Sequence, residues 1–406
     1  MLLALENGVQ GGKWYSLMDK VWQGENLSAG WMKAFVNEGS AGIDGQSIKQ
    51  FTAHLGKELD RLQTELRDRR YEPHPVRRCW VPKPGSKEKR PLGIPAVRDR
   101  IVQGAARNVM EPIFERVFAQ YSYGFRPGRG CKEALRRVAQ LLAAGNIWTV
   151  DVDLKSYFDT IPHDQLMARV KELISDGRLL ALIEQYLKAG VMEGLKGWEP
   201  TEQGTPQGAV ISPMLANLYL NPLDHLMEAQ GYALTRYADD FVVQCRSEAE
   251  AQAALELIRQ WVQANGLTLH PTKTRIVDAT QRGGFEFLGY HFERGLKWPR
   301  QKSLDKLKDT LRHKTRRTQG KSIEEVIADL NLTLRGWFEY FKHSHGSIFA
   351  PLDGWVRMRL RSILRKQQGK KGRGRGSDHQ KWPNAYFDKL GYFNLVKAHR
   401  LAVQSH

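Results

Sequence analysis

Residues 236–243, RYADDFVV, place two adjacent aspartates between two short apolar runs. The runs at 233–236 and 241–245 have the length and composition of strands, so the acidic pair is predicted at the tip of a β-hairpin. Asp239 and Asp240 then stand side by side, where two carboxylates repel each other unless a cation lies between them. The pair alone leaves two readings open, because solvated turns rich in aspartate are common.

A third carboxylate favours the metal-binding reading. Residues 147–153, IWTVDVD, form an apolar run of the buried-strand type that ends on acidic residues. Nucleotidyl transfer is accelerated by two Mg²⁺ ions about 3.5–4 Å apart, and Mg²⁺ needs few protein ligands because it keeps water and phosphate oxygens. We therefore predict that Asp153, Asp239 and Asp240 are catalytic and bind two Mg²⁺ ions.

The sequence around these aspartates predicts helices alternating with short strands. Helices are expected over residues 14–37, 47–70, 98–119, 131–144, 163–174, 178–189, 213–229 and 247–265. Besides the strands above, a strand pair is expected near 273–292 and a hairpin over 76–95, around a loop rich in Pro, Gly and Lys. This alternation predicts an α+β fold with a mixed sheet, and not a doubly wound one.

Charge is distributed very unevenly along the 406 residues. The formal net charge is +18, and residues 296–406 carry 25 Lys and Arg against 9 Asp and Glu, a net charge of +16. Residues 1–295 carry 37 basic and 35 acidic residues and are nearly neutral. A basic face gains affinity by releasing counterions from phosphates, so the asymmetry favours nucleic acid as a partner, with an acidic membrane surface as the alternative.

Strand signals largely stop after residue 296. Residues 302–319, 322–343 and 351–368 have the helical apolar spacing of a small bundle, and 367–376, QQGKKGRGRG, are expected to be a mobile basic linker. No stretch of 18 or more apolar residues and no basic leader occur, so neither a membrane span nor a signal peptide is expected. The three single cysteines fit a reducing cytoplasm.

Several further blocks follow one another along the chain. They are VPKPGSKEKRPLGIPAVRDRIVQGA, SYGFRPGRG, DVDLKSYFDTIPH, GTPQGAVISPMLANLYL, RYADDFVV, LTLHPTKT and FEFLGY. Together they resemble the reverse transcriptases encoded by bacterial group II introns, from about residue 14 to the end of the chain. The resemblance implies a right-hand polymerase of fingers and palm, followed by an α-helical thumb.

The resemblance also implies a division into domains. It gives an N-terminal extension over 1–45 with a template lid near 37–44, fingers and palm over 46–295, a thumb or maturase domain over 296–366, and a basic C-terminal extension over 367–406. The segment LRGWFEYF resembles the thumb of intron maturases, and WPNAYFDKLGYFNLVKAHR resembles the ending of a class C subset. Because no HNH pattern and no paired cysteines follow, an endonuclease domain is not expected.

Residue roles are carried over from the matching motifs. Asp153, Asp239 and Asp240 match the metal-binding aspartates, whereas Asp151 is expected to be structural and Asp159 has no assigned role. The residues expected to bind the incoming dNTP are Lys83, Arg90 (or its neighbour Lys89), Phe158 and Gln207. The residues expected to contact template or primer, with packing or a solvated loop as the alternative, are Arg126, Arg129, Tyr237, Lys273, Leu288 and Gly289.

The resemblance implies an RNA-directed DNA polymerase that also assists the splicing and mobility of its intron. The expected partners are structured intron RNA, an RNA template with a DNA primer, a DNA target and dNTPs, in the bacterial cytoplasm near the nucleoid. Two alternatives remain open from the sequence. One is a free-standing transcriptase of the group II type in DNA repair or defence, and the other is an RNA-binding maturase that acts in splicing only.

Overall fold

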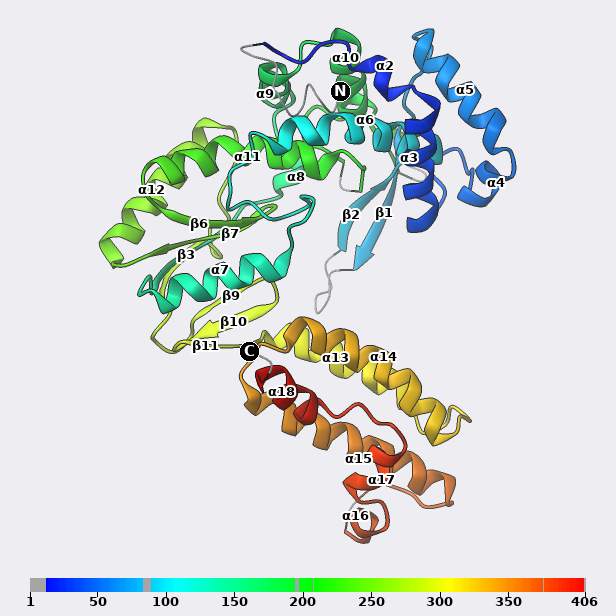
Figure 1. Cartoon of the computed structure of the whole chain (residues 1–406), viewed down its shortest axis with the longest axis vertical. Helices are drawn as coiled ribbons and strands as arrows, with labels where there is room; N and C mark the ends of the chain where they lie inside the picture. The colour runs from blue at the N-terminus through cyan, green and yellow to red at the C-terminus, as the bar shows by residue number, and fades with distance from the viewer. Residues whose placement is uncertain (1–11, 83–88, 194–196, 207, 375, 405–406) are drawn as a thin grey trace. The chain divides into compact units, whose positions relative to one another are not determined.

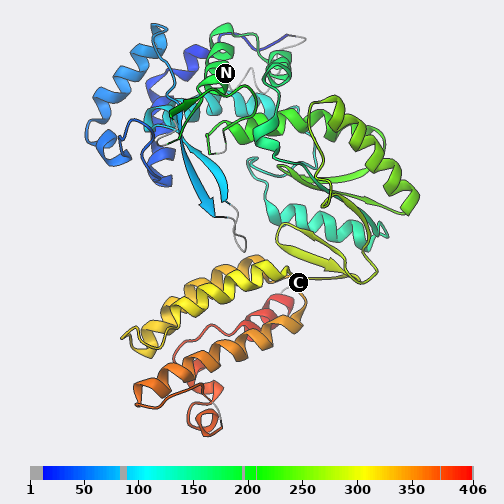
Figure 2. The same cartoon turned by 180° about the vertical axis from the view of Figure 1, so that it is seen from behind.

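The computed structural model describes residues 12–82, 89–193, 197–206, 208–374 and 376–404. The chain folds into two compact units, Met1–Val277 and Asp278–His406. Figures 1 and 2 show strands and helices together in the first unit, and helices with one small sheet in the second. Mixed helices and hairpin-linked strands confirm the α+β prediction. Within the described ranges, no helix is long and apolar enough to span a bilayer.

A four-stranded sheet of the first unit, here called the central sheet, carries the acidic motif. Its strands, in the order β6-β7-β3-β8, are β6 (Ala233–Tyr237), β7 (Asp240–Cys245), β3 (Trp148–Asp153) and β8 (Arg275–Asp278). Strands β6 and β7 form the predicted antiparallel hairpin, and β3 pairs antiparallel with β7. All of β7 after its first residue is buried, so the acidic motif stands at the end of a rigid central strand.

A second sheet of the first unit, here called the hairpin sheet, has the order β2-β1-β4-β5. Its strands are β1 (Val76–Pro82), β2 (Lys89–Ile94), β4 (Val191–Glu193) and β5 (Gly197–Glu199). The antiparallel pair β1–β2 confirms the predicted hairpin. Strands β4 and β5 were not predicted, because three residues are too few to show the alternation of buried and exposed positions that marks a strand.

Helices cover the central sheet and enclose one hydrophobic core with it. They are α2 (Met18–Val21), α3 (Gly24–Asn37), α4 (Ile48–Ala53), α5 (Leu55–Arg67), α6 (Val97–Glu115), α7 (Cys131–Ala143), α8 (Tyr157–Thr160), α9 (His163–Leu173), α10 (Gly177–Lys188), α11 (Ser212–Ala229) and α12 (Glu248–Ala264). The predicted helices are confirmed, except that the first two are each divided into two shorter ones. Figure 1 shows α11 and α12 on one side of the central sheet and α7 on the other, so both faces of the sheet are buried.

The second unit begins with a three-stranded sheet that corrects one prediction. Its strands are β9 (Phe285–Phe287), β10 (Tyr290–Glu293) and β11 (Leu296–Pro299), in the order β11-β10-β9. The expected strand pair near 273–292 therefore does not complete the central sheet, to which only β8 belongs. Leu288 and Gly289 have φ of 46° and 84°, which closes β9 onto β10 as a local hairpin.

A helical bundle with its own core follows. Its helices are α13 (Gln301–Lys314), α14 (Ile323–Phe341), the 3₁₀ turn η2 (Gly346–Ile348), α15 (Phe349–Gln367), α16 (Ser377–Lys381), α17 (Asn384–Lys389) and α18 (Leu395–Gln404). The three helices predicted from apolar spacing are confirmed as α13, α14 and α15. The last segments belong to the same core, because Trp382, Phe387 and Leu395 are buried in it. The glycine-rich stretch packs back onto α15, where the Gly374 amide donates to the Ser362 hydroxyl over 3.2 Å.

Candidate active site

The antiparallel register of the central sheet brings the three predicted aspartates to one end of it. The Cα atom of Asp153, the last residue of β3, lies opposite that of Asp240, the first residue of β7. Ala238 and Asp239 form the two-residue turn between β6 and β7, and Tyr237 pairs with Asp240 across it. We call residues 237–240 the YADD turn. The left-handed φ of 57° at Ala238 gives the turn the backbone twist that a tight hairpin requires.

The electrostatics of this end of the sheet favour a bound cation. Asp239 is half-buried, Asp240 is exposed, and the side chain of Asp153 is 35% exposed. Burial raises the pKa of Asp239, the charge of Asp153 raises it further, and the Arg236 guanidinium opposes the rise. A divalent cation between these carboxylates would relieve both the burial and the repulsion.

Lys273 supplies a positive charge to Asp153 in this structure. Its Nζ atom lies 2.6 Å from Oδ2 of Asp153, and its side chain is 63% exposed. The backbone of Asp153 is held separately, because the His270 amide donates to its carbonyl oxygen over 2.7 Å. Among the residues that the structure describes, no three His, Cys, Asp or Glu side chains are arranged to hold a metal ion. The carboxylate oxygens nevertheless fit Mg²⁺ chemically, and an exposed lysine can leave Asp153 at little cost.

A buried ion pair stabilises the YADD turn through a hydrogen bond to its backbone. The sequence analysis did not predict this pair. Arg236 of β6 and Asp224 of α11 are both almost fully buried, and the Arg236 Nε lies 2.7 Å from an Asp224 carboxylate oxygen. Arg236 also donates to Oδ1 of Asn217 and to the carbonyl oxygen of Ala238, both over 2.9 Å. The only sequence signal was a charged residue in an otherwise buried strand, which needs a partner if its side chain points inward.

The loop that contains FRPGRG is bonded to the same strand. The Tyr123 amide donates to the carbonyl oxygen of Arg236 over 2.9 Å, and the Arg236 amide donates to that of Tyr121 over 3.0 Å. Arg126 does not fit its predicted contact with template, because it is buried and donates to Glu115, to Ala119 and to Ser122. It braces the loop instead. Arg129 is half-buried and donates to the Gln120 carbonyl oxygen.

The residues predicted to bind the dNTP are only partly within the described ranges. Lys83 and Gln207 lie outside them. Arg90 and Lys89 are both exposed on β2, where Arg90 pairs with Val81 of β1. Phe158 in α8 is half-buried, lies edge-on to Tyr157 at 5.5 Å, and its carbonyl oxygen accepts a hydrogen bond from the Thr205 amide over 2.6 Å.

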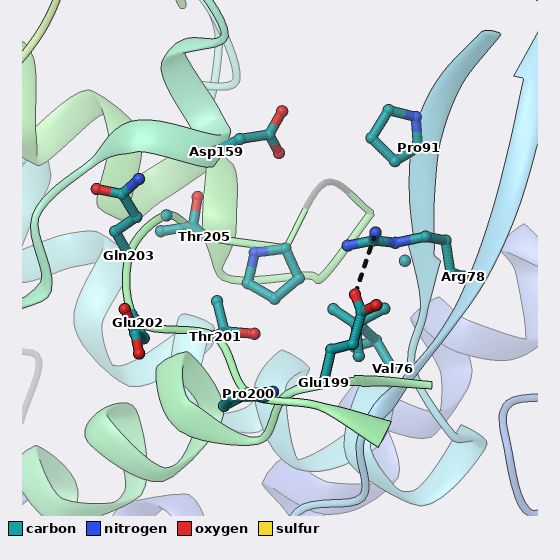
Figure 3. A pocket seen from close by; sticks show the side chains of 14 residues that line it. Val76, Arg78, Pro91, Asp159, Glu199, Pro200, Thr201, Glu202, Gln203 and Thr205 are labelled. Carbon is teal, nitrogen blue, oxygen red and sulfur yellow. Dashed lines mark ion pairs between the residues drawn. The ribbon is translucent and has the colours of Figure 1, made fainter. Parts of the chain in front are cut away.

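A pocket of about 880 Å³ lies between the hairpin sheet and residues 200–206. Figure 3 shows Asp159 and Thr205 on one wall and Arg78 and Pro91 on the other, with Arg78 turned toward Glu199, whose carboxylate is 3.8 Å from it. Asp159 therefore lines this pocket, whereas Asp151 forms an ion pair with Arg275 over 3.5 Å. A structural role for Asp151 stays a prediction.

Leu288 and Gly289 lie in the second unit, at the turn between β9 and β10. The Tyr340 hydroxyl donates to the Leu288 carbonyl oxygen over 2.7 Å, and the Arg300 amide donates to that of Gly289 over 2.9 Å. These bonds tie the small sheet to the first helices of the bundle. The two carbonyl oxygens are thus bonded within the second unit, and a primer contact of Leu288 and Gly289 stays a prediction.

Two family models match the chain. The model described as reverse transcriptase (RNA-dependent DNA polymerase) matches residues 81–292, and the model described as group II intron, maturase-specific domain, matches residues 304–382. The first covers the central sheet, the YADD turn and the hairpin sheet except for most of β1. The chain therefore belongs to the reverse transcriptase family, whose members are polymerases that depend on divalent metal ions.

Similar proteins place it among the group II intron type of reverse transcriptase. It is 37% identical to the protein YkfC of Escherichia coli (strain K12), over 62% of this chain and 76% of that protein. It is 41% identical to the group II intron-encoded protein LtrA of Lactococcus lactis subsp. cremoris, over 41% of this chain but 28% of LtrA. Among solved structures, a partial Cas6-RT-Cas1–Cas2 complex is similar at 26% identity and a TM-score of 0.38, over 61% of this chain and 41% of that one.

Proposed function

We propose that this chain copies RNA into cDNA and that Asp153, Asp239 and Asp240 hold two Mg²⁺ ions for the reaction. The observation that carries the proposal is the register of the central sheet, which sets Asp153 opposite Asp240 with Asp239 in the adjoining turn. Carboxylates on two strands and a tight turn form a rigid set of oxygen ligands. When bound, the metal ions would stabilise the attacking 3′-hydroxyl oxygen and the leaving pyrophosphate oxygen.

Within this proposal, the side chains of the protein position the metal ligands and balance their charges. Arg236 holds the YADD turn, and Lys273 stabilises the Asp153 carboxylate until the substrate complex forms. Arg90, with Lys83, is proposed to bind the triphosphate, because cations on a hairpin can close on phosphate charge as the dNTP arrives. Phe158 and Gln207 are proposed to contact the incoming nucleotide, with Phe158 beneath its sugar.

Primer extension tests the proposal directly. Purified chain with Mg²⁺, an RNA template, a DNA primer and dNTPs should extend the primer, and chelation of Mg²⁺ should abolish extension. Asp239→Ala or Asp240→Ala should lower the rate by about three powers of ten, because each removes several kcal/mol of metal-borne stabilisation. Glu256→Ala, an exposed carboxylate on α12, is the matched control. Extension that survives both aspartate variants would refute the assignment.

We also propose that the chain assists the splicing and mobility of a group II intron, with structured intron RNA and a DNA target as partners in the cytoplasm. The maturase-specific match over residues 304–382 supports this, together with the net charge of +16 in residues 296–406. Addition of the chain to its cognate intron RNA should speed splicing at low Mg²⁺ concentration. The double variant Asp239→Ala/Asp240→Ala should keep this effect while losing extension.

The splicing proposal fails if the chain neither speeds splicing nor lowers its Mg²⁺ requirement. The alternative, a free-standing transcriptase in DNA repair or defence, would retain extension without any effect on intron RNA. Intron RNA domains in the DNA that flanks the gene would favour the intron role, and their absence would favour the free-standing one.

A further inference from the structure

A second aromatic ring lies beside the YADD turn. Phe125, in the loop that contains FRPGRG, has its ring centroid 6.1 Å from that of Tyr237, with 46° between the two ring planes. The residue is 49% exposed. One exposed apolar side chain is ordinary, but this one lies next to the proposed catalytic turn, where a bound substrate can reach it.

The backbone of Phe125 has a conformation that is unfavourable for a bulky residue. Phe125 has φ of 57°, a left-handed conformation that is unusual for a bulky residue and that glycine would adopt without strain. Such strained positions persist only where the surrounding structure enforces them, and they are found often at functional sites.

The enforcing contacts come from the YADD turn itself. A Cβ atom on Gly124 would lie 2.4 Å from the Ala238 nitrogen, so only glycine allows the loop to come this close to the turn. On its other side, the Asn217 side-chain amide donates to the Gly124 carbonyl oxygen over 2.6 Å. Asn217 in turn accepts a hydrogen bond from Arg236 over 2.9 Å, so the loop and the turn share one rigid support.

The residues next to the ring indicate which ligand it would contact. The proposed metal ligands Asp239 and Asp240 follow Tyr237 directly, and the 3′-hydroxyl of the primer must reach the metal ions that they hold. The last nucleotide of the primer therefore lies within reach of a ring that packs on Tyr237. Aromatic side chains bind the sugar and base of a nucleotide through apolar contact that does not depend on sequence.

We propose that Phe125 and Tyr237 form an aromatic contact surface for the 3′-terminal nucleotide of the primer strand. This inference rests on the proposed polymerase function and adds a primer-binding residue to it. The strained backbone presents the ring, and the ring holds the primer end over the aspartates.

The test combines primer affinity with stability. Phe125→Ala and Phe125→Gly should each raise the KM for the primer–template duplex about tenfold, the size of a lost aromatic contact with a nucleotide, and leave the KM for dNTP unchanged. Phe125→Gly should keep or raise the melting temperature, because it relieves the left-handed strain. Phe125→Leu should restore part of the affinity. Tyr15→Ala, which removes a ring that is 72% exposed, is the matched control and should change neither quantity.

Two outcomes would overturn the inference. An unchanged KM for primer–template in both Phe125→Ala and Phe125→Gly would show that the ring does not contact the primer. A melting temperature that falls in both variants, with activity lost in proportion, would make Phe125 a packing residue. Binding of a fluorescent primer–template duplex without dNTP separates the two proposals, because it tests the contact even in a chain that does not extend.

Discussion

Each unit of this molecule contains a buried charge that holds a piece of backbone, and the two charges have opposite signs. In the first unit, the buried cation Arg236 donates to the Ala238 carbonyl oxygen of the YADD turn. In the second, the buried anion Asp353 of α15 accepts hydrogen bonds from the amides of Leu395 and Val396, at the start of α18, over 3.2 and 3.1 Å. In this molecule, a backbone carbonyl oxygen is held by a buried cation, and backbone amides are held by a buried anion.

The physical reason is the same in both places. A tight turn can leave a carbonyl oxygen without a partner, so it needs a donor, whereas the first turn of a helix leaves amides that need an acceptor. The two supports differ in how the charge is balanced. Arg236 has Asp224 as a full counter-ion, while the donors to Asp353 within the described ranges are the neutral Leu395 and Val396 amides and the Tyr392 hydroxyl, the last over 2.8 Å. Breaking the ion pair should therefore have the larger effect.

The largest effect is expected from Arg236→Met. The variant leaves Asp224 buried without its partner, which costs about 3–5 kcal/mol of stability. It also releases the Ala238 carbonyl oxygen, and misplacement of the catalytic carboxylates by about 1 Å lowers activity roughly a hundredfold. Urea unfolding and primer extension measure the two effects.

The double variant Arg236→Met/Asp224→Leu separates positioning from stability. Replacing both charges with apolar side chains should recover much of the folding free energy, because no buried charge is left unpaired. Extension should stay low, since the Ala238 carbonyl oxygen still lacks its donor. Recovery of both stability and extension would show that Arg236 only stabilises the fold.

The second largest effect is expected from Asp353→Ala. Three donors lose their acceptor in a buried position, and each unsatisfied group costs about 1–3 kcal/mol, so we expect a loss of about 3 kcal/mol. Urea unfolding followed by tryptophan fluorescence measures it, with Asp305→Ala, an exposed aspartate of α13, as the control. A loss no larger than that of the control would mean that α18 needs no buried acceptor.

These networks also mark where prediction from the sequence succeeded and where it stopped. Local apolar periodicity was enough to predict most helices and the hairpin of β6 and β7, because both elements are formed by residues close together in the sequence. The approach of Asp153 to Asp240 was anticipated from two strand ends with acidic residues. Arg236 was missed, because its partners Asp224 and Asn217 are on α11, which only the folded chain brings to it. The proposed role of Phe125 was missed for a similar reason, because it depends on the contact of its loop with the YADD turn. For Arg126, the sequence did not show that the side chain is buried and bonded to Glu115, Ala119 and Ser122, and its contact with template stays a prediction.

A smaller effect is expected in the segment proposed as the template lid. A Cβ atom at Gly42 would lie 2.4 Å from the Ala96 Cα, and the Arg77 side chain holds the neighbouring Ala41 carbonyl oxygen over 2.8 Å. Gly42→Ala should displace the loop and cost about 2 kcal/mol, as overpacking usually does. Gly56→Ala in α5 has open space around it and should stabilise the helix slightly. Thermal melting of both variants measures the difference in their melting temperatures. Equal melting temperatures would contradict the prediction.

The smallest effect is expected from Tyr237→Phe. Burial, and then a hydrogen bond with the Cys131 thiol, raises the pKa of the Tyr237 hydroxyl from 10.0 to about 12. The stability that this shift contributes is fully present below pH 10 and is lost as the pH rises toward 12. Tyr237→Phe should therefore lose about 1 kcal/mol at neutral pH, the size of one hydrogen bond, and lose stability less steeply than the wild type between pH 10 and 12.

Because the ring beside Phe125 remains, the KM for primer–template should not change. Unfolding in urea across this pH range measures the first effect, and a tenfold rise in that KM would show that the hydroxyl group, and not the ring, contacts the primer.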